Sequence, residues 1–202
     1  MPRSDTALIM IDIQNDFCPG GALAVDGGSD IIARINQLQA DYAVQVLTQD
    51  WHPKDHSSFA ENQNGAEAFT MIDMPYGPQV LWPVHCVQGS HGADFYSNLR
   101  TDRADMILRK GFRSAIDSYS AFFENDHKTR TGLEGYLRKR GVHDLVMVGL
   151  ATDFCVRYSA VDAAKLGFHV TVLEGACRAI DLDGSLVAAR KDMLDHGIRL
   201  VD

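Results

Sequence analysis

Residues 143–164 read HDLVMVGLATDFCVRYSAVDAA, and this stretch decides the fold. Its apolar run, Leu145–Val148, is typical of a buried strand and ends at Gly149. A turn of small residues follows, after which Asp153 is expected to cap a helix. Cys155 then lies in the first turn of that helix, where the helix dipole and free backbone N–H groups favour a thiolate. The alternative for Cys155 is a small buried side chain that fills the core.

Strands and helices alternate in the same way along the rest of the chain. Apolar runs predict further strands at Ala7–Ile13, Ala43–Leu47, Met106–Leu108, Phe168–Leu173 and Ile198–Val201. Helical spacing predicts helices at Ser29–Leu38, Thr131–Arg140, Asp153–Leu166 and Leu182–Asp195. This order is typical of a parallel sheet covered by helices on both faces. We therefore expect one α/β domain, residues 1–202, with three α/β/α layers and a mostly parallel central sheet of five or six strands.

Residues 48–105 interrupt this alternation. They hold both tryptophans, most of the prolines and four of the eight histidines, with little periodicity. A segment of this length without a regular pattern is usually functional, so we expect a metal-binding and pocket loop region. Ligands of open α/β sheets bind beyond the carboxyl ends of the strands. Asp12, Asp50, Lys110 and Cys155 all lie at or just after such ends, and we expect them at that edge of the sheet.

Composition narrows the classes of partner. The chain has 202 residues, 46% of them hydrophobic and 23% charged, with a formal net charge of −8. The acidic balance offers no basic surface for nucleic acid or an anionic membrane. No signal peptide or membrane span is evident, so we expect a cytoplasmic protein. The four scattered cysteines are expected to be thiols. Whether the chain forms a homo-oligomer stays open.

The strings QDWHPKDH and WPVHCVQGSH bring one carboxylate and several imidazoles into the loop region. Asp50 and His52 are two residues apart, which points both side chains the same way in an extended segment. His56 returns after a turn at a proline, and His85 is favoured over His91 as a further ligand. One carboxylate and three imidazoles suit one divalent ion, with Zn²⁺ favoured and Fe²⁺ or Mn²⁺ as alternatives. The competing interpretation is a set of solvated loop side chains.

Asp12 and Lys110 each carry a charge into an apolar strand end, which is costly unless the charge is paired. A shared site above the sheet would pair the two charges with each other. Asp12 would accept the proton of Cys155, and Lys110 would stabilise the thiolate and keep Asp12 ionised. A structural Asp–Lys ion pair with the cysteine merely nearby is the alternative.

Five strings together resemble the nicotinamidase/pyrazinamidase group of the isochorismatase-like cysteine hydrolases. They are IDIQNDF, QDWHPxxHxSF, WPxHCVxGxxG, KG and GLATDFCV, and they occur in order over nearly the whole chain. The KG pair alone is unspecific, whereas the metal strings and ATDxCV are highly specific. The resemblance implies the isochorismatase-like hydrolase fold. It also implies hydrolysis of nicotinamide to nicotinate and ammonia in NAD salvage, with pyrazinamide as a second substrate, through a thioester on Cys155.

The resemblance also implies roles for individual residues. The catalytic triad is Asp12, Lys110 and Cys155. The metal ligands are Asp50, His52, His56 and His85. A cis peptide precedes Ala151, whose N–H forms the oxyanion hole with that of Cys155, while Phe17, Trp82 and Ala151 contact the substrate. Asp117 and Tyr119 receive no role beyond lining or closing the pocket.

Two rival functions remain open. An isochorismatase or a carbamoyl-amide hydrolase keeps a similar catalytic core but generally lacks the Asp–His cluster. A metal-binding or sensor module, in which Cys155 is only a core thiol, predicts metal binding without turnover. A papain-like peptidase is disfavoured, because the chain lacks the local sequence around that family's cysteine.

Overall fold

The computed structural model describes residues 3–202, and its core is a six-stranded parallel sheet. The strands lie in the order β5–β2–β1–β6–β7–β8, which confirms the predicted mostly parallel sheet. Their bounds are β1 (Arg3–Ile11), β2 (Tyr42–Asp50), β5 (Met106–Lys110), β6 (Asp144–Leu150), β7 (His169–Arg178) and β8 (Arg199–Val201). The two central strands are apolar and buried over Ala7–Ile11 of β1 and Leu145–Leu150 of β6, because helices cover both faces.

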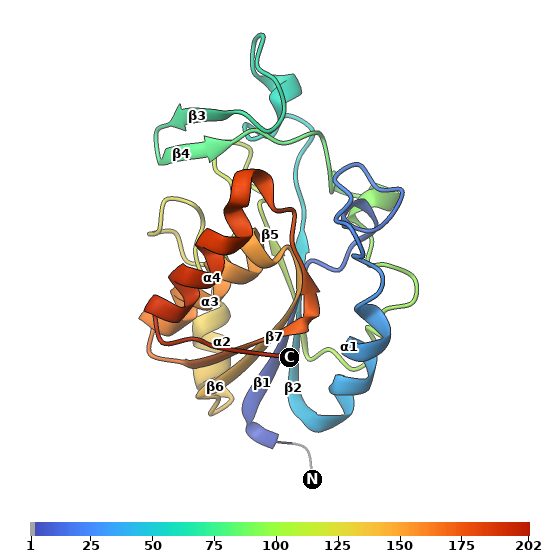
Figure 1. Ribbon diagram of the computed structural model, residues 1–202, viewed down its shortest axis with the longest axis vertical. Helices are drawn as coiled ribbons and strands as arrows, with labels where there is room; N and C mark the ends of the chain where they lie inside the picture. Colours follow the sequence, from blue (N-terminus) through green and yellow to red (C-terminus); the bar gives the residue numbers. More distant parts are fainter. Residues whose placement is uncertain (1–2) are drawn as a thin grey trace.

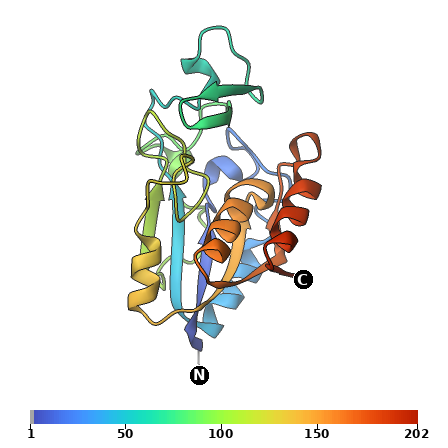
Figure 2. The same ribbon diagram turned by 90° about the vertical axis from the view of Figure 1, so that its left-hand side faces the viewer.

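Four helices cover the two faces of the sheet and complete the expected three layers. They are α1 (Ile32–Leu38), α2 (Leu133–Lys139), α3 (Arg157–Lys165) and α4 (Ser185–Asp195). The helices α3 and α4 lie side by side on one face, and α1 lies on the other (Figures 1 and 2). No helix in the described part of the chain is long and apolar enough to span a membrane.

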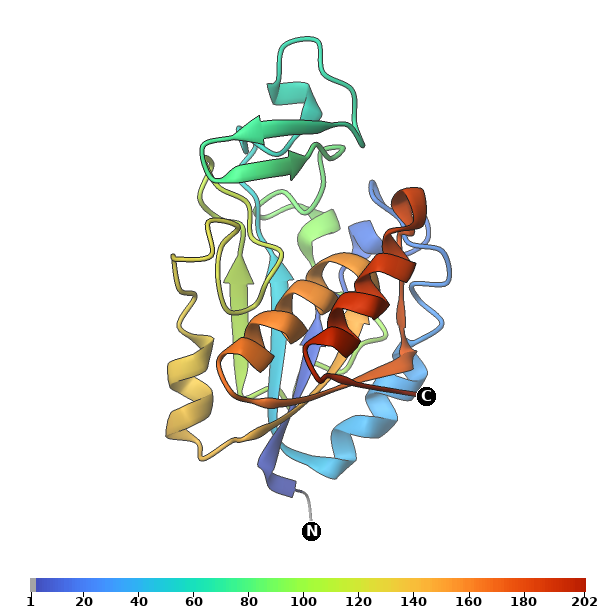
Figure 3. The same cartoon turned by 60° about the vertical axis from the view of Figure 1, so that its left-hand side comes forward.

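Residues 48–105 contain a small antiparallel hairpin that the sequence pattern did not predict. It consists of β3 (Met71–Met74) and β4 (Gly77–Val80). The hairpin lies at the end of the molecule toward which β1, β2 and β5 point (Figure 3). Four-residue strands with prolines beside and within them carry too little alternation to be recognised. The rest of this region consists of turns and short 3₁₀ segments, and it positions the predicted metal ligands.

Several expected boundaries differ from the observed ones at the functional edge of the sheet. The first strand ends at Ile11 rather than Ile13, because Asp12 takes a positive φ of 48° and turns the chain. The segment after β6 begins as a π-helical turn, Thr152–Val156, before α3 starts. The π-turn is therefore where Cys155 lies. Wider helical turns of this kind occur frequently at functional sites.

Candidate active site and metal centre

The ends of three strands bring Asp12, Lys110 and Cys155 together. Asp12 directly follows β1, Lys110 ends β5, and Cys155 lies in the turn after β6. The Lys110 Nζ atom is 2.8 Å from Asp12 Oδ2 and 3.4 Å from Cys155 Sγ. All three side chains are buried. The structure thus places a carboxylate, an ammonium and a thiol in mutual contact, as the sequence pattern predicted.

Lys110 also connects this group to Asp50. Its Nζ atom is 2.5 Å from Asp50 Oδ1 and donates to the Ser118 carbonyl at 2.9 Å. Burial alone would lower the pKa of Lys110, but the carboxylates of Asp12 and Asp50 outweigh it and raise that pKa well above its ordinary value. Lys110 is therefore a permanent cation between the two carboxylates.

Asp12 is held by Thr48 on the neighbouring strand. The Thr48 hydroxyl donates to Asp12 Oδ1 at 2.6 Å, and its oxygen accepts the Asp12 backbone N–H at 3.2 Å. Burial raises the pKa of Asp12, and the attraction of Lys110 offsets only part of that rise. A carboxylate with a raised pKa is a stronger base than an ordinary aspartate, which suits it to accept a proton from a neighbouring thiol.

The surroundings of Cys155 differ from the local expectation of a thiolate. Burial raises the pKa of the Cys155 thiol well above its ordinary value, and Lys110 offsets only part of the effect. The helix start is buried inside the protein, so desolvation outweighs the favourable backbone dipoles. Cys155 therefore rests as a thiol and needs a base to become a nucleophile.

Asp153 does not cap the helix as predicted, because its carboxylate binds a different segment. It accepts the backbone N–H groups of Ile180 and Asp181 at 3.1 and 2.8 Å, and the Ser185 hydroxyl at 2.5 Å. The residue at the cap position is Ala151, which offers no side-chain cap. Asp153 thus ties the π-helical turn, Thr152–Val156, to the chain that leads into α4, a non-local contact that no local pattern indicates.

Ala151 lies at the junction of β6 and the π-helical turn. The Leu150–Ala151 peptide bond is cis, as the resemblance implies. The Ala151 carbonyl accepts the N–H groups of Phe154 and Val156, both at 3.1 Å. Ala151 and Cys155 both line the same pocket.

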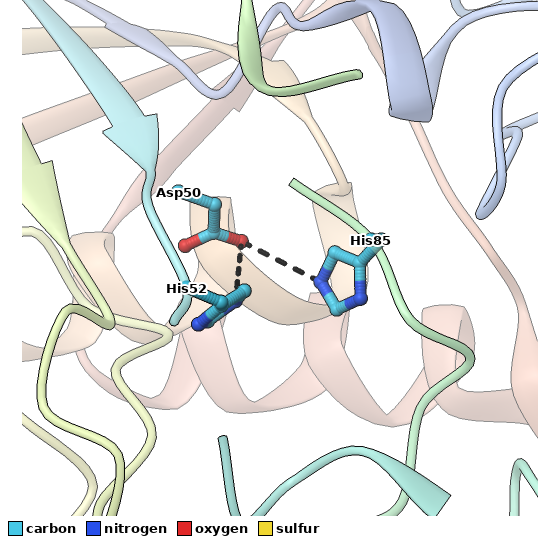
Figure 4. Close-up of side chains that lie close together, drawn as sticks. All are labelled: Asp50, His52 and His85. Carbon is cyan, nitrogen blue, oxygen red and sulfur yellow. Dashed lines mark ion pairs between the residues drawn. The ribbon is translucent and has the colours of Figure 1, made fainter. Parts of the chain in front are cut away.

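Asp50, His52 and His85 converge on one point, and their ligand atoms all lie within 4.8 Å of one another (Figure 4). The Nε2 atoms of His52 and His85 lie 3.7 and 3.9 Å from Asp50 Oδ2. Each histidine has its Nδ1 atom 2.8 Å from a backbone carbonyl, that of Gly111 for His52 and that of Pro83 for His85. Such a bond directs the Nε2 lone pair toward the shared point, which is the usual arrangement of metal-binding histidines. This donor set fits a divalent metal ion.

Gly111 allows His52 to take this position. A Cβ atom at Gly111 would lie 2.4 Å from a ring carbon of His52, and the residue has a φ of +66°. Both facts favour glycine, since it has no Cβ and tolerates positive φ. The glycine that follows Lys110 in the sequence is thus required by the ring of a predicted metal ligand.

Charge and burial favour the metal-binding forms of Asp50 and His85. Burial would raise the pKa of Asp50, but Lys110 and His52 outweigh it and hold that pKa below its ordinary value. Burial lowers the pKa of His85 to about 4, which keeps the ring neutral. At His52 the carboxylate of Asp50 outweighs burial and raises the pKa, so a metal ion there competes with one proton.

His56 is adjacent to this group through His52. The two ring centroids are 4.4 Å apart, and the Nδ1 atom of His56 is 2.7 Å from Ser58 Oγ. The ligand atoms of His52, His56 and Asp117 form a second close group, which shares His52 with the group of Asp50, His52 and His85. Of the four predicted ligands, the structure brings three to one point and places the fourth beside them.

Two polar residues that the sequence pattern did not single out hold the predicted ligands. The Gln14 side chain donates to the Asp50 carbonyl at 2.8 Å and accepts the Asp50 N–H at 2.8 Å. Asp16 accepts the N–H of Cys86, the residue after His85, at 2.7 Å. The only local signal was a run of polar residues directly after a buried strand.

A pocket lies between the thiol and the imidazoles. Its walls include the predicted substrate contacts Phe17 and Trp82, and Trp82 donates its indole N–H to the Tyr119 hydroxyl at 3.0 Å. The lining residues are Phe17, Leu23, Asp50, His52, Trp82, His85, Asp117, Tyr119, Ala151, Phe154, Cys155 and Ile180. His91 is exposed outside the pocket, where Asn15 contacts it. All four cysteines are free thiols, as predicted.

Solved structures with the same fold include several of named function. One is a nicotinamidase/pyrazinamidase from Acinetobacter baumanii, 50% identical, with a TM-score of 0.99 over 100% of this chain and 98% of the other. A second is PnC1 from L. infantum in complex with nicotinate, 39% identical, with a TM-score of 0.87 over 100% and 95%. A third is a pyrazinamidase from Pyrococcus horikoshii in complex with zinc, 35% identical, with a TM-score of 0.78 over 98% and 99%.

Comparisons of sequence agree with the comparisons of structure. The family model for the isochorismatase domain matches residues 6–202. A nicotinamidase from Acinetobacter baylyi is 51% identical over 198 residues, which cover 98% of this chain and 92% of the relative. Both findings confirm the resemblance that the sequence motifs indicated. The chain therefore belongs to the isochorismatase family.

Proposed function

We propose that this chain is a metal-dependent cysteine amidohydrolase that converts nicotinamide to nicotinate and ammonia. The observation that carries the proposal is the arrangement of the pocket. A thiol with an adjacent carboxylate and ammonium lies on one wall, and a carboxylate with imidazoles lies on the other. A flat ring with a nitrogen on one side and a carboxamide on the other matches both walls at once. The named relatives at 50% and 51% identity support this substrate, and pyrazinamide has the same two features.

In this proposal the metal ion is held by Asp50, His52 and His85, with His56 as the fourth ligand. The predicted ion is Zn²⁺, which this mixture of carboxylate and imidazole donors suits, and the zinc complex of the Pyrococcus relative supports it. Fe²⁺ and Mn²⁺ remain alternatives. When bound, the ion supplies a Lewis-acidic position that orients the ring nitrogen of the substrate.

The first half of the reaction begins with proton transfer. Asp12 takes the proton of the Cys155 thiol, and the Lys110 ammonium at 3.4 Å from the sulfur stabilises the thiolate. The thiolate attacks the carboxamide carbon, and the N–H groups of Ala151 and Cys155 donate to the resulting oxyanion. Losing one such donor typically costs about 10²–10³-fold in rate. Asp12 then returns its proton to the leaving nitrogen, and ammonia departs.

The second half hydrolyses the thioester. Asp12, again a carboxylate, removes a proton from a water molecule that attacks the thioester carbon. The carbon–sulfur bond breaks, the Cys155 sulfur regains a proton, and nicotinate leaves. Phe17 and Trp82 flank the substrate ring in both halves and hold the reacting carbon above the sulfur.

Carbamoyl-amide hydrolysis within the same family is the nearest alternative. That reaction needs the triad but no ring-nitrogen site, whereas here two histidines have their Nδ1 atoms held by backbone carbonyls and their Nε2 atoms near one carboxylate. The test is ammonia release by the purified, metal-loaded protein from nicotinamide and from an N-carbamoyl amide, side by side. We expect turnover of nicotinamide alone. Turnover of the N-carbamoyl amide alone would contradict the proposal.

A further inference from the structure

Asp117 is a buried carboxylate in the pocket to which the sequence assigned no role. It lines the same pocket as the predicted metal ligands. Its Oδ1 atom accepts the Ser118 backbone N–H, and its Oδ2 atom accepts the Nε2–H of Gln79, both at 2.8 Å. Both donors are neutral. None of the ion pairs formed by residues 3–202 involves Asp117, so its negative charge has no salt-bridge partner within that range.

Asp117 is nevertheless close to the predicted metal donors. Ligand atoms of Asp117, His52 and His56 all lie within 4.8 Å of one another. His52 belongs to this group and also to the group with Asp50 and His85. The unpaired carboxylate therefore neighbours the point that Asp50, His52 and His85 face.

Counting the buried charges of the site gives Asp117 a physical reason to be there. Asp12 and Cys155 share one proton, so together they carry one negative charge whichever group holds it. Asp50 and Lys110 carry opposite charges and pair directly. Asp117 adds a second negative charge, so the site as a whole carries two when the histidines are in the neutral form that binds a metal ion. One divalent cation neutralises it, and burying uncompensated charge is costly.

We propose that Asp117 is the carboxylate that balances the charge of the metal ion, and that Gln79 of the β3–β4 hairpin holds it in place. This inference rests on the proposed metal site. Asp50 supplies a ligand oxygen, but its negative charge is already balanced by Lys110. Asp117 supplies the further negative charge that offsets the charge of the metal ion. Gln79 is suited to its part because it is itself buried and is further fixed by Asn125, whose amide donates to Gln79 Oε1 at 3.0 Å.

Zinc affinity of the metal-free protein, measured by titration against a chromophoric chelator, tests the proposal without relying on activity. Replacing a residue that supports metal ligands typically weakens metal affinity about 10–100-fold, and we expect a loss of this size for Asp117→Asn. Asp117→Glu keeps the charge and should stay within severalfold of wild type. Asp162→Asn removes another buried carboxylate, on α3 and outside the pocket, and should leave zinc affinity unchanged.

Three outcomes would overturn the inference. Wild-type affinity in Asp117→Asn would show that its charge does not act on the metal. Equal losses in Asp117→Asn and Asp117→Glu would show that shape rather than charge matters. A wild-type protein that binds no zinc, iron or manganese would contradict the metal site itself, so failure of the proposed function is recognised separately. Thermal melting of each metal-free variant checks folding, and Asp117→Ser replaces Asp117→Asn if the latter does not fold.

Discussion

Asp12, Lys110 and Cys155 come from the ends of parallel strands, whereas His52, His56 and His85 come from the irregular region between β2 and β5. The first wall of the pocket follows from strand register. Asp50 and Lys110 are direct partners in the pairing of β2 with β5, and Ile11, just before Asp12, pairs with Gly149 of β6. Once the sheet forms, these side chains meet.

The second wall depends on single hydrogen bonds to the histidine rings, and one of these comes from a residue distant in sequence. A carbonyl from the segment after β5 holds His52, a carbonyl two residues away holds His85, and a nearby serine hydroxyl holds His56. This contrast indicates that the triad and the imidazoles have separate structural supports, which meet at the contact between Asp50 and Lys110. Changes to one wall should leave the other largely intact, and each prediction below tests that separation.

Removing the nucleophile should have the largest effect. We expect Cys155→Ala to lower kcat by about 10⁴-fold or more, as loss of a nucleophile does elsewhere. Its metal content should equal that of the wild type, because the sulfur is not among the predicted ligands. Elemental analysis and an ammonia assay measure the two properties. Cys177→Ala, which removes another buried thiol in β7, should keep turnover within severalfold.

Removing an imidazole should weaken metal binding more than it changes any other property. We expect His85→Ala to weaken zinc affinity by more than the roughly 10–100-fold typical of residues that only support ligands. Activity should fall in proportion to metal content, while the circular dichroism spectrum stays that of the wild type. His91→Ala alters an exposed histidine of the same segment and serves as the control. Full zinc affinity in His85→Ala would show that the second wall does not bind metal.

The pH dependence of kcat/KM distinguishes the contributions of the two pocket walls without a mutation. Asp12 must be ionised to take the thiol proton, and burial raises its pKa above the ordinary 3.8. As pH falls through that raised value, kcat/KM should drop about tenfold per pH unit, since one required proton acceptor is lost. Metal content measured over the same range identifies the cause. If kcat/KM falls only as metal is lost, the decrease at low pH reflects protonation of the histidines rather than of Asp12.

Loosening the support of a ligand should have the smallest effect. Gln14→Met leaves the backbone N–H and carbonyl of Asp50 without their partner, which costs about 1–3 kcal/mol for a buried polar group. Urea unfolding should reveal this loss together with a modest decrease in zinc affinity. Gln37→Met changes an exposed glutamine on α1, away from the site, and should alter neither. Equal stability of both variants would mean that Gln14 does not support the second wall.

The same division explains how much could be predicted from sequence. The parallel sheet and the meeting of Asp12, Lys110 and Cys155 were predictable, because apolar runs locate strands and parallel strands end at one edge. The hairpin and the support given by Gln14, Asp16 and Gln79 were not, since they depend on contacts between residues far apart in the chain. Asp153 shows the limit most clearly, because its local setting is that of a helix cap and its real partners are near α4.

Cleavage of nicotinamide through Cys155 is tested most directly by quenching the metal-loaded enzyme with acid during turnover and examining the intact protein and its peptides by mass spectrometry. We expect a nicotinoyl thioester on the peptide that contains Cys155, together with ammonia release that Cys155→Ala abolishes. An acyl adduct on another residue, or wild-type ammonia release by Cys155→Ala, would contradict it.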